Sequence, residues 1–410
     1  TESLAMLRST RLPAFTGYLE AAQHNAVLKV TDRRVWKYWF WENLWGNGRV
    51  NRDPMVRENI MITGWYALAL GAYQLTTGDR SIDAEGSLPF RWSERKVYEY
   101  SYPKIVDTLV RNFDASPLLF YPCEPNWVFF YCNEEGMAGL ILYDRFHGTN
   151  HAERLLPTFI TRMEQEFTCA DGAQIVIMAN RIGLQLKARS ATLFAGNLWL
   201  RSMLAPDLAA RSWEMVRHEY LREGSDELFE LGPLDRIDSG NYRSNRDGHG
   251  FYPQIMVAAK EIGDIEVYEY ARAKQNALGI ENVEGRLRWP GSTFANLTSH
   301  IGRFGTPGAW NRLAHSEYPQ AWRAGPVLSD APYPDVLVSR AVSDGRALEL
   351  ELVSGTHGGR VELGFERLAP GAGYRLEGVA TQTLTADGTG RAAIQLDLDR
   401  RTPLQLIPEI

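Results

Sequence analysis

The chain has 410 residues and a formal net charge of −6 with no block of basic residues, which argues against a nucleic-acid partner. Its hydrophobic share of 44% and charged share of 23% are those of an ordinary globular protein, and no apolar run approaches the length of a membrane span. The length exceeds the size at which one core usually stops growing, so we expect two structural units.

Aromatic residues crowd the segment VWKYWFWENLWGN near the N-terminus. Six of them lie within ten positions: Trp36, Tyr38, Trp39, Phe40, Trp41 and Trp45. Such a surface either packs between the first helices or forms the wall of a pocket for an apolar or planar ligand. The pattern leaves both interpretations open.

Helical hairpins follow in chain order. Apolar residues recur at helical spacing from Met55 to Leu75, and the next such helix is expected from about Met137. The positions that break successive helices are Gly78, Gly148, residues 205–207 and Gly263. Sequential helix pairs with short connections are typical of a solenoid or a closed α/α toroid, and the irregular spacing of the breaks favours the toroid.

The segment FYPCEPNWVFFYCNEEGMAG places Cys123 and Cys132 nine positions apart around an aromatic run. Asn133, Glu134 and Glu135 follow, just before the expected helix. Carboxylates at a helix start are ordinary caps as well as candidate acids. Free cysteines are more often small hydrophobic residues than nucleophiles.

A glycine-rich polar loop, SGNYRSNRDGHGFYPQ, delivers Asp247, His249 and Tyr252 to the start of a later helix. Loops of this composition often carry function, and His249 is a candidate general base. The alternative is a plain helix start with Asp247 as its cap.

Near the C-terminus the sequence changes to short segments in which apolar and polar residues alternate, separated by turn-forming residue pairs. This pattern predicts antiparallel strands. We expect a helical domain over residues 1–315, a proline-rich linker over 316–334 and a small β-sandwich over 335–410.

Three cysteines are too few for a disulfide framework in a chain of this size. No basic segment with an apolar core opens the chain, so we expect a cytoplasmic protein or a processed secreted one. No histidine or cysteine cluster has zinc-like spacing, and no phosphate-binding glycine loop is present, so we expect neither a metal nor a cofactor.

Several of these segments together resemble the linalool dehydratase/isomerase family. The matching stretches are RVW at 34–36, ENIM at 58–61 with Gly64, YQLTTGDR at 73–80, CEPNWVFFYCN at 123–133, LYDRFHGT at 142–149, EIGD at 261–264 and WPGS at 289–292. Their order and spacing hold from roughly residue 30 to 315, and the two-cysteine stretch is the most specific.

The resemblance implies an (α/α)6 barrel and cofactor-free acid/base chemistry on an isoprenoid alcohol, by loss or addition of water and allylic isomerisation. It also implies that Met61, Cys123 and Cys132 line the reaction cavity. Aromatic and sulfur groups suit a cation-like transition state, because they stabilise spread positive charge without capturing it.

The departures from the family matter. Trp65 stands where the family has an active-site histidine, and Thr192 stands near the place of an expected tyrosine. The N-terminal helices are shorter, the β-domain is an addition, and Glu134 and Glu135 replace small neutral residues. We therefore expect that the acid has moved and that the substrate is not linalool.

We expect a lyase, isomerase or cyclase acting on an isoprenoid-like or other apolar unsaturated small molecule, in a chain that can form a homo-oligomer. Glu134 is the expected proton donor, with Cys132 or Asp247 as its complement and Cys123 beside them. The expected substrate-binding residues are Met61, Trp65, Tyr38, Trp41, Trp45, Asn133, Glu135, His249 and Tyr252.

Two other functions remain open. A glycan-processing α/α-toroid enzyme, a hydrolase, lyase or epimerase, would use Glu134 and Asp247 as acid and base, with tryptophans as sugar platforms. A non-catalytic binding protein would hold a ligand tightly without converting it.

Overall fold

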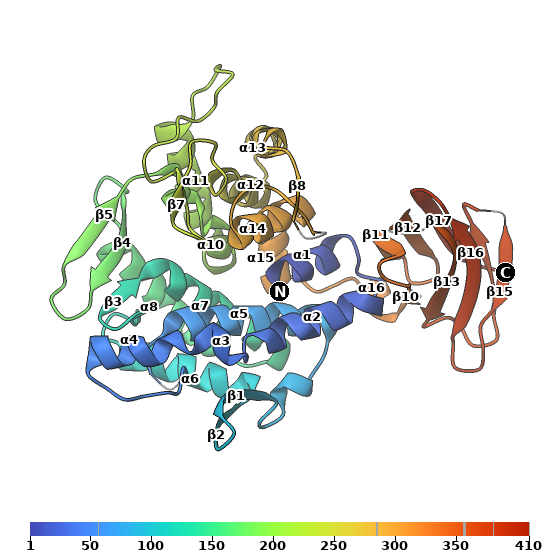
Figure 1. The fold of residues 1–410 in the computed structure, drawn as a ribbon, viewed down its shortest axis with the longest axis horizontal. Helices are drawn as coiled ribbons and strands as arrows, with labels where there is room; N and C mark the ends of the chain where they lie inside the picture. The colour runs from blue at the N-terminus through green and yellow to red at the C-terminus, as the bar shows by residue number, and fades with distance from the viewer. Residues whose placement is uncertain (56, 284–285, 356–357, 380, 410) are drawn as a thin grey trace. The chain divides into compact units, whose positions relative to one another are not determined.

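The computed structural model describes residues 1–55, 57–283, 286–355, 358–379 and 381–409. The chain forms two compact units, a helical one of Thr1–Ser3 with Val27–His315 and a β-rich one of Leu4–Ala26 with Ser316–Ile410 (Figure 1). No helix among the described residues is long and apolar enough to cross a membrane.

Residues 4–26 belong to the β-rich unit, whereas we expected them in a helical domain over 1–315. The reason is packing: Phe15 and Leu19 are buried in the core of the sheets. The backbone oxygen of Ala14 also accepts a hydrogen bond from Leu328, and its backbone nitrogen donates to Ala341. The N-terminal segment therefore completes the β-rich unit.

The helices of the helical unit are interrupted by short strands. The helices are α3 (Arg33–Trp36), α4 (Tyr38–Asn47), α5 (Ile60–Thr77), η1 (Ser81–Asp83), α6 (Tyr102–Ala115), α7 (Phe130–His147), α8 (His151–Glu166), α9 (Ala191–Ala195), α10 (Leu198–Leu204), α11 (Pro206–Tyr220), α12 (Phe251–Ile262), α13 (Ile265–Ala277), α14 (Thr293–Phe304) and α15 (Ala309–His315). The strands are β1 (Leu88–Ser93), β2 (Lys96–Tyr100), β3 (Trp127–Phe129), β4 (Gln174–Ala179), β5 (Gln185–Ala188), β6 (Ile237–Asp238), β7 (Arg243–Ser244), β8 (Glu281–Val283) and β9 (Arg286–Arg288).

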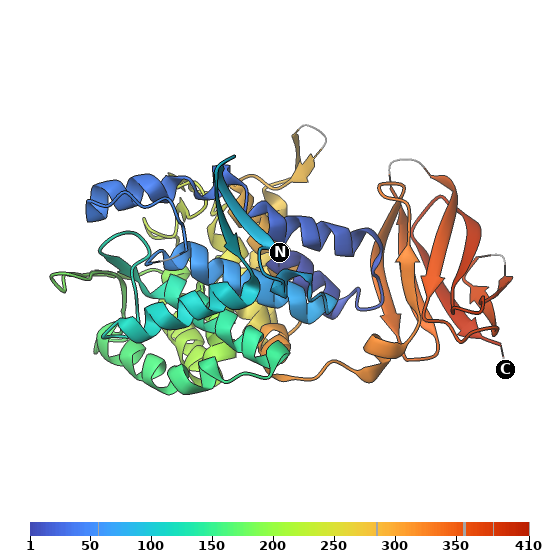
Figure 2. The same cartoon turned by 90° about the horizontal axis from the view of Figure 1, so that it is seen from below.

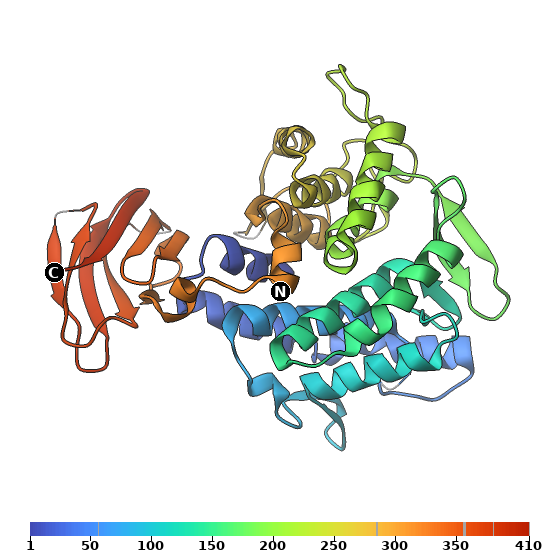
Figure 3. The same cartoon turned by 180° about the vertical axis from the view of Figure 1, so that it is seen from behind.

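Five of these helices pack in succession, α5 on α7, α7 on α10, α10 on α12 and α12 on α14 (Figure 3). Trp65 of α5 meets Phe294 of α14 with ring centroids 6.2 Å apart. Helices α8 and α13 pack on α7 and α12, whereas α6 packs on α5 and α7, and α11 packs on α10 and α12. The unit is mainly helical, as expected.

The predicted helix breaks are confirmed. Gly78, Gly148 and Gly263 end α5, α7 and α12 in the left-handed conformation that a side chain disfavours. Ala205 separates α10 from α11.

Glycines let α5 and α7 approach closely. A Cβ atom on Gly64 would lie 3.0 Å from the backbone nitrogen of Gly136, and one on Gly139 would lie 2.8 Å from the nitrogen of Leu68. The second distance is one that real Cβ atoms essentially never show, and the first is tighter than nine in ten real Cβ contacts, so side chains here would push the helices apart. This contact fixes the start of α7, where the candidate site lies.

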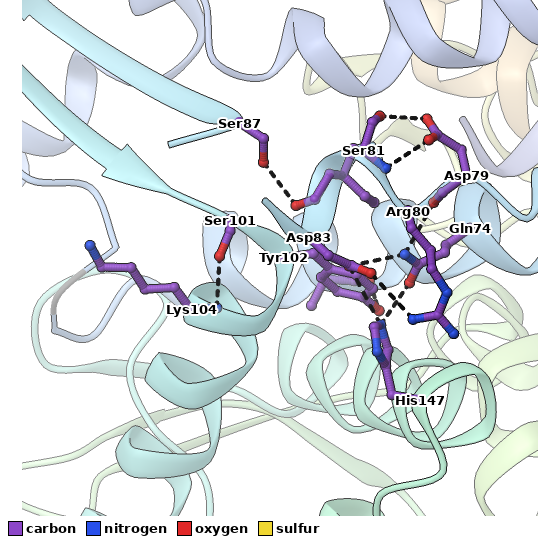
Figure 4. Close-up of polar contacts among 12 residues, drawn as sticks. Gln74, Asp79, Arg80, Ser81, Asp83, Ser87, Ser101, Tyr102, Lys104 and His147 are labelled. Atoms are coloured by element: carbon purple, nitrogen blue, oxygen red, sulfur yellow. Dashed lines mark hydrogen bonds and ion pairs between the residues drawn. The ribbon is translucent and has the colours of Figure 1, made fainter. Parts of the chain in front are cut away.

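A polar clasp of Gln74, Asp83 and His147 joins the far ends of α5 and α7 (Figure 4). The side-chain nitrogen of Gln74 donates to Asp83 Oδ1 at 3.0 Å, and its oxygen lies 2.9 Å from His147 Nε2. Since the Gln74 oxygen can only accept, His147 Nε2 carries the proton. Burial lowers the pKa of His147 from its ordinary value.

The β-rich unit contains α1 (Glu2–Thr10) and α2 (Gly17–Lys29) in part, and two antiparallel sheets (Figure 2). One sheet has the order β10-β13-β16 and the other β11-β12-β17-β14-β15. Their bounds, with the helix α16 (Gln320–Ala324), are β10 (Val327–Asp330), β11 (Val336–Ser343), β12 (Leu348–Ser354), β13 (Gly359–Glu366), β14 (Gly373–Glu377), β15 (Gln382–Thr385), β16 (Ala392–Leu398) and β17 (Thr402–Pro408).

Alternate residues of these strands are buried in one hydrophobic core that draws on both sheets. Leu350 and Leu352 of β12 and Leu363 of β13 are examples, each at most 2% exposed. Residues 316–334, expected as a linker, contribute α16 and β10 instead. Val327 and Leu328 of β10 are buried, which explains why the segment is ordered.

Candidate active site

Helix α7 begins at Phe130, seven residues before the expected start near Met137. Asn133, Glu134 and Glu135 therefore lie inside the helix and are all buried, so the carboxylates are not helix caps. The sequence predicted a later helix start because Asn133, Glu134 and Glu135 are polar, and buried carboxylates are rare without partners.

The side-chain amide of Asn133 ties the preceding loop to α7. Its oxygen accepts a hydrogen bond from the backbone nitrogen of Tyr121 at 3.0 Å. Its nitrogen donates to the backbone oxygens of Tyr121 and Phe129 at 3.2 and 2.8 Å. Asn133 was expected to contact substrate, but its buried amide is engaged in holding the loop in place.

This loop brings Cys123 and Cys132 together, with their Sγ atoms 3.4 Å apart as free thiols. Cys123 is 2% exposed and Cys132 is half-buried. The hydrogen bond with Cys132, followed by burial, raises the pKa of Cys123 well above its ordinary value. Cys123 is therefore a neutral thiol, which can carry a proton but is a poor nucleophile.

Glu124 follows Cys123 directly and was not singled out from the sequence. Burial raises the pKa of its carboxyl group, and a hydrogen bond from the Cys123 thiol opposes that rise. Its Oε2 atom is buried and has no partner among the described residues. The sequence feature that could have identified Glu124 is its position beside a cysteine, in the two-cysteine stretch that resembles the family.

One face of α4 lies against this loop. Burial raises the pKa of the Tyr38 phenol, and the nearby Cys123 and Glu124 raise it further. A Cβ atom on Gly46, two turns along, would lie 2.5 Å from the side chain of Pro125. Tyr38 thus lies near the two cysteines, and its contact with substrate stays a prediction.

Trp41 and Trp45 point elsewhere. Their side chains are 56% and 83% exposed, so they do not form the wall of a closed cavity. Trp36 and Trp39 are instead the buried members of the aromatic segment, each 1% exposed. The segment packs by helical periodicity, and its two exposed tryptophans lie on the opposite side from that core.

Glu134 forms a buried ion pair with Arg201 of α10. Arg201 Nε donates to Glu134 Oε1 at 2.7 Å, and both side chains are at most 1% exposed. Burial raises the pKa of Glu134, and the Arg201 guanidinium opposes it. We take the ionised pair as the stable state because a neutral Glu134 would leave Arg201 as a lone buried charge. The expected role as proton donor is therefore disfavoured.

Arg201 was missed by the sequence analysis. It interrupts the apolar run LWLRSML, and a lone arginine in such a run requires a buried partner. That partner was not identifiable from sequence, because Glu134 lies 67 positions away.

Glu135 has the opposite environment from its neighbour. It is 1% exposed, and its Oε2 atom has no partner among the described residues. Burial, followed by repulsion from Cys132, Glu2 and Glu134, raises its pKa well above the ordinary value. Burial therefore favours the protonated form of Glu135, which lies one helical turn from Cys132.

Met61 and Trp65 lie one turn apart on α5 and are both half-buried. Trp65 packs against Phe294, and Thr63 between them shares a hydrogen bond of 2.7 Å with the Tyr121 hydroxyl. The first turns of α5 thus contact the loop that carries Cys123.

The loop residues Asp247, His249 and Tyr252 are not joined to the cysteines by any described contact. Asp247 is 69% exposed, and His249 lies 3.8 Å from its carboxylate. Tyr252 is buried in a separate core with Phe251 and Tyr270. Gly250, not Asp247, stands at the N-cap of α12, so the expectation that Asp247 caps this helix is wrong.

We call Tyr38, Cys123, Glu124, Cys132 and Glu135 the thiol–carboxyl cluster. Within the described parts of the chain, no three histidine, cysteine or acidic side chains are arranged to hold a metal ion. In four of its members, Tyr38, Cys123, Glu124 and Glu135, burial raises the pKa and favours the neutral, protonated form.

A family model described as linalool dehydratase/isomerase matches residues 3–292. Among solved structures, the Lin0763 protein from Listeria innocua is 13% identical, with 77% of this chain and 87% of that chain covered and a TM-score of 0.40. A glycoside hydrolase is 11% identical, with coverage of 100% and 75% and a TM-score of 0.35. A β-L-arabinofuranosidase from Geobacillus stearothermophilus T6 is 14% identical, with coverage of 100% and 71% and a TM-score of 0.33.

Proposed function

Because this chain belongs to the linalool dehydratase/isomerase family, we propose that it is a cofactor-free acid/base enzyme that adds or removes water, or shifts a double bond, on an apolar unsaturated alcohol. An isoprenoid-like substrate and an (α/α)6 barrel with an appended β-sandwich are part of this proposal. Cyclisation of such a substrate would use the same chemistry.

The observation that carries the proposal is the thiol–carboxyl cluster. Two thiols whose Sγ atoms are 3.4 Å apart have Glu124 next to one thiol and Glu135 one turn from the other. The raised pKa values of Cys123, Glu124 and Glu135 keep protons available without a charge that would capture a carbocation.

In dehydration, Glu135, acting through or beside Cys132, gives a proton to the substrate hydroxyl, and the carbon–oxygen bond breaks to release water. A neighbouring carbon–hydrogen bond then supplies the electron pair of the new double bond, and the Glu135 carboxylate left by the first step takes that proton, directly or through Cys132. One proton is given and one is taken, so no co-reactant is consumed. Hydration follows the same steps in reverse.

Met61 and Trp65 are proposed to line the apolar part of the site. A thioether and an indole face stabilise spread positive charge without forming a bond to it. Tyr38 is proposed to orient the hydroxyl group, because its own proton is held by burial.

The glycan-processing alternative paired Glu134 with Asp247. Glu134 is buried against Arg201, whereas the Asp247 side chain is 69% exposed. Acid and base on one glycosidic bond share a single cleft, so this pair does not favour that alternative.

The proposal is tested by incubating the protein with a pool of terpenoid and other unsaturated alcohols and following masses. We expect a product that differs by one water, or an isomer of unchanged mass. Conversion of oligosaccharides but of no alcohol, or tight binding of an alcohol without conversion, would contradict the proposal.

A further inference from the structure

A second polar cleft lies in the helical unit, between the connection from α4 to α5 and helix α6. Its volume is about 760 Å³, and its lining is Asn43, Arg49, Val50, Asn51, Arg57, Arg111, Asn112 and Ala115. Neither the thiol–carboxyl cluster nor the proposed function uses these residues.

The lining carries three arginines and no carboxylate. Arg57 Nε lies 3.9 Å from Glu58, a loose contact on a side chain that is 59% exposed. Arg111 donates to Thr108 Oγ1 at 3.3 Å. Arg49 and Arg57, both in the connection, bring positive charge to the cleft, and Arg111 of α6, which also makes other contacts, borders it.

A buried amide donor also faces the cleft. Asn43 is 4% exposed, and its Nδ2 atom has no partner among the described residues. Its oxygen is already engaged, because it accepts a hydrogen bond from Asn47 Nδ2 at 3.1 Å. A buried N–H group without an acceptor costs free energy, so an acceptor supplied by a ligand would restore the lost hydrogen bond.

We propose that this cleft binds the phosphate or diphosphate group of a small molecule. Guanidinium groups bind such oxyanions through paired N–H donors, and the Asn43 amide adds a neutral donor. The volume exceeds what one phosphate fills, and Val50 and Ala115 give the cleft an apolar edge for the rest of the ligand. The site requires neither thiol, so it stands apart from the proposed function.

The test is isothermal titration calorimetry of the full chain with inorganic pyrophosphate at low ionic strength. We expect binding that added salt weakens, because the arginines are exposed. Arg49→Gln and Arg57→Gln should each weaken it about tenfold, as expected for loss of a charge-assisted hydrogen bond. Asn43→Ala should also weaken it, and thermal unfolding of each variant checks that the fold is kept.

Arg95→Gln is the matched control, because Arg95 is an exposed arginine outside the cleft lining. Absence of pyrophosphate binding, or equal affinity in the parent and the three cleft variants, would overturn the proposal.

A second titration identifies the source of the anion. Tighter binding of geranyl diphosphate than of pyrophosphate, lost in Arg49→Gln, assigns the cleft to the head group of an apolar ligand. Equal affinities assign it to a free anion. Both results support the site, and binding of geraniol with an affinity equal to that of its diphosphate would count against it.

Discussion

Two adjacent glutamates in α7 have opposite electrostatic environments. Glu134 is paired with Arg201 at 2.7 Å, whereas Glu135 is buried with thiol and carboxyl groups near it and no cation. The two glutamates are adjacent in the sequence, which does not show which of them pairs with a cation. The packing of α7 against α10 distinguishes them, because it places Arg201 beside Glu134. An acid for catalysis must hold its proton, and Glu135 is the one that does.

We predict opposite effects of glutamine at these two positions. Glu134→Gln leaves Arg201 as a buried charge and should lower the free energy of unfolding by about 3 kcal/mol. Glu135→Gln should preserve stability at neutral pH but lower turnover roughly 10²-fold to 10⁴-fold. Urea unfolding and turnover of both variants test this, and a stable, inactive Glu134→Gln with an active Glu135→Gln would reverse our assignment.

The pH dependence of stability gives a second measure of the same assignment. The pKa of Glu135 lies above its ordinary value of 4.5 in the folded chain, so the unfolded chain releases this proton first as pH rises. Below about pH 4.5 the stabilising contribution of protonated Glu135 is fully present, and the free energy of unfolding falls as pH rises above that value. In Glu135→Gln, which cannot ionise at this position, the free energy of unfolding should not show this fall.

At the scale of elements, α5 and α7 are held together at both ends of their contact. Gly64 sets the approach near Cys132, while Gln74, Asp83 and His147 hold the far end. The helix ends were predictable because Gly78 and Gly148 have a local conformational reason to stand there. The early start of α7 was not predictable, since it depends on Arg201 and on the loop held by Asn133.

The polar clasp should make stability depend on pH near neutrality. The pKa of His147 is lowered by burial, with Arg80 adding to the effect and Asp83 and Asp144 opposing it. The unfolded chain therefore takes up a proton first as pH falls below about 6.5, and the unfolding free energy should fall with it. His147→Gln should flatten this dependence in urea unfolding measured across that range. An unchanged slope in the variant would show that other groups cause it.

At the scale of the whole molecule, composition and hydrophobic period predicted a helical unit and a C-terminal β-rich unit. Local patterns do not reveal which distant segment completes a core, and residues 4–26 were assigned to the helical unit for that reason. The site shows the same limit. Cys123, Cys132 and Tyr38 were found from sequence, whereas Glu124 and Arg201 required the fold, and Trp41, Trp45 and Asp247 proved to be exposed.

We predict that chelation leaves turnover unchanged, because the proposed steps move protons between thiol and carboxyl groups alone. The measurement is turnover before and after dialysis against EDTA, with metal content determined in both samples. A loss of activity that zinc or manganese restores would contradict this.

The most direct test of the central claim is the turnover of Cys132→Ser on the alcohol that the parent protein converts. We expect a fall of roughly 10²-fold to 10⁴-fold with unfolding free energy little changed, because a hydroxyl is a weaker acid than the thiol it replaces. Cys169→Ser is the control, since Cys169 lies outside the thiol–carboxyl cluster, and it should keep the parent rate. Parent-like turnover of Cys132→Ser would show that the chemistry lies elsewhere.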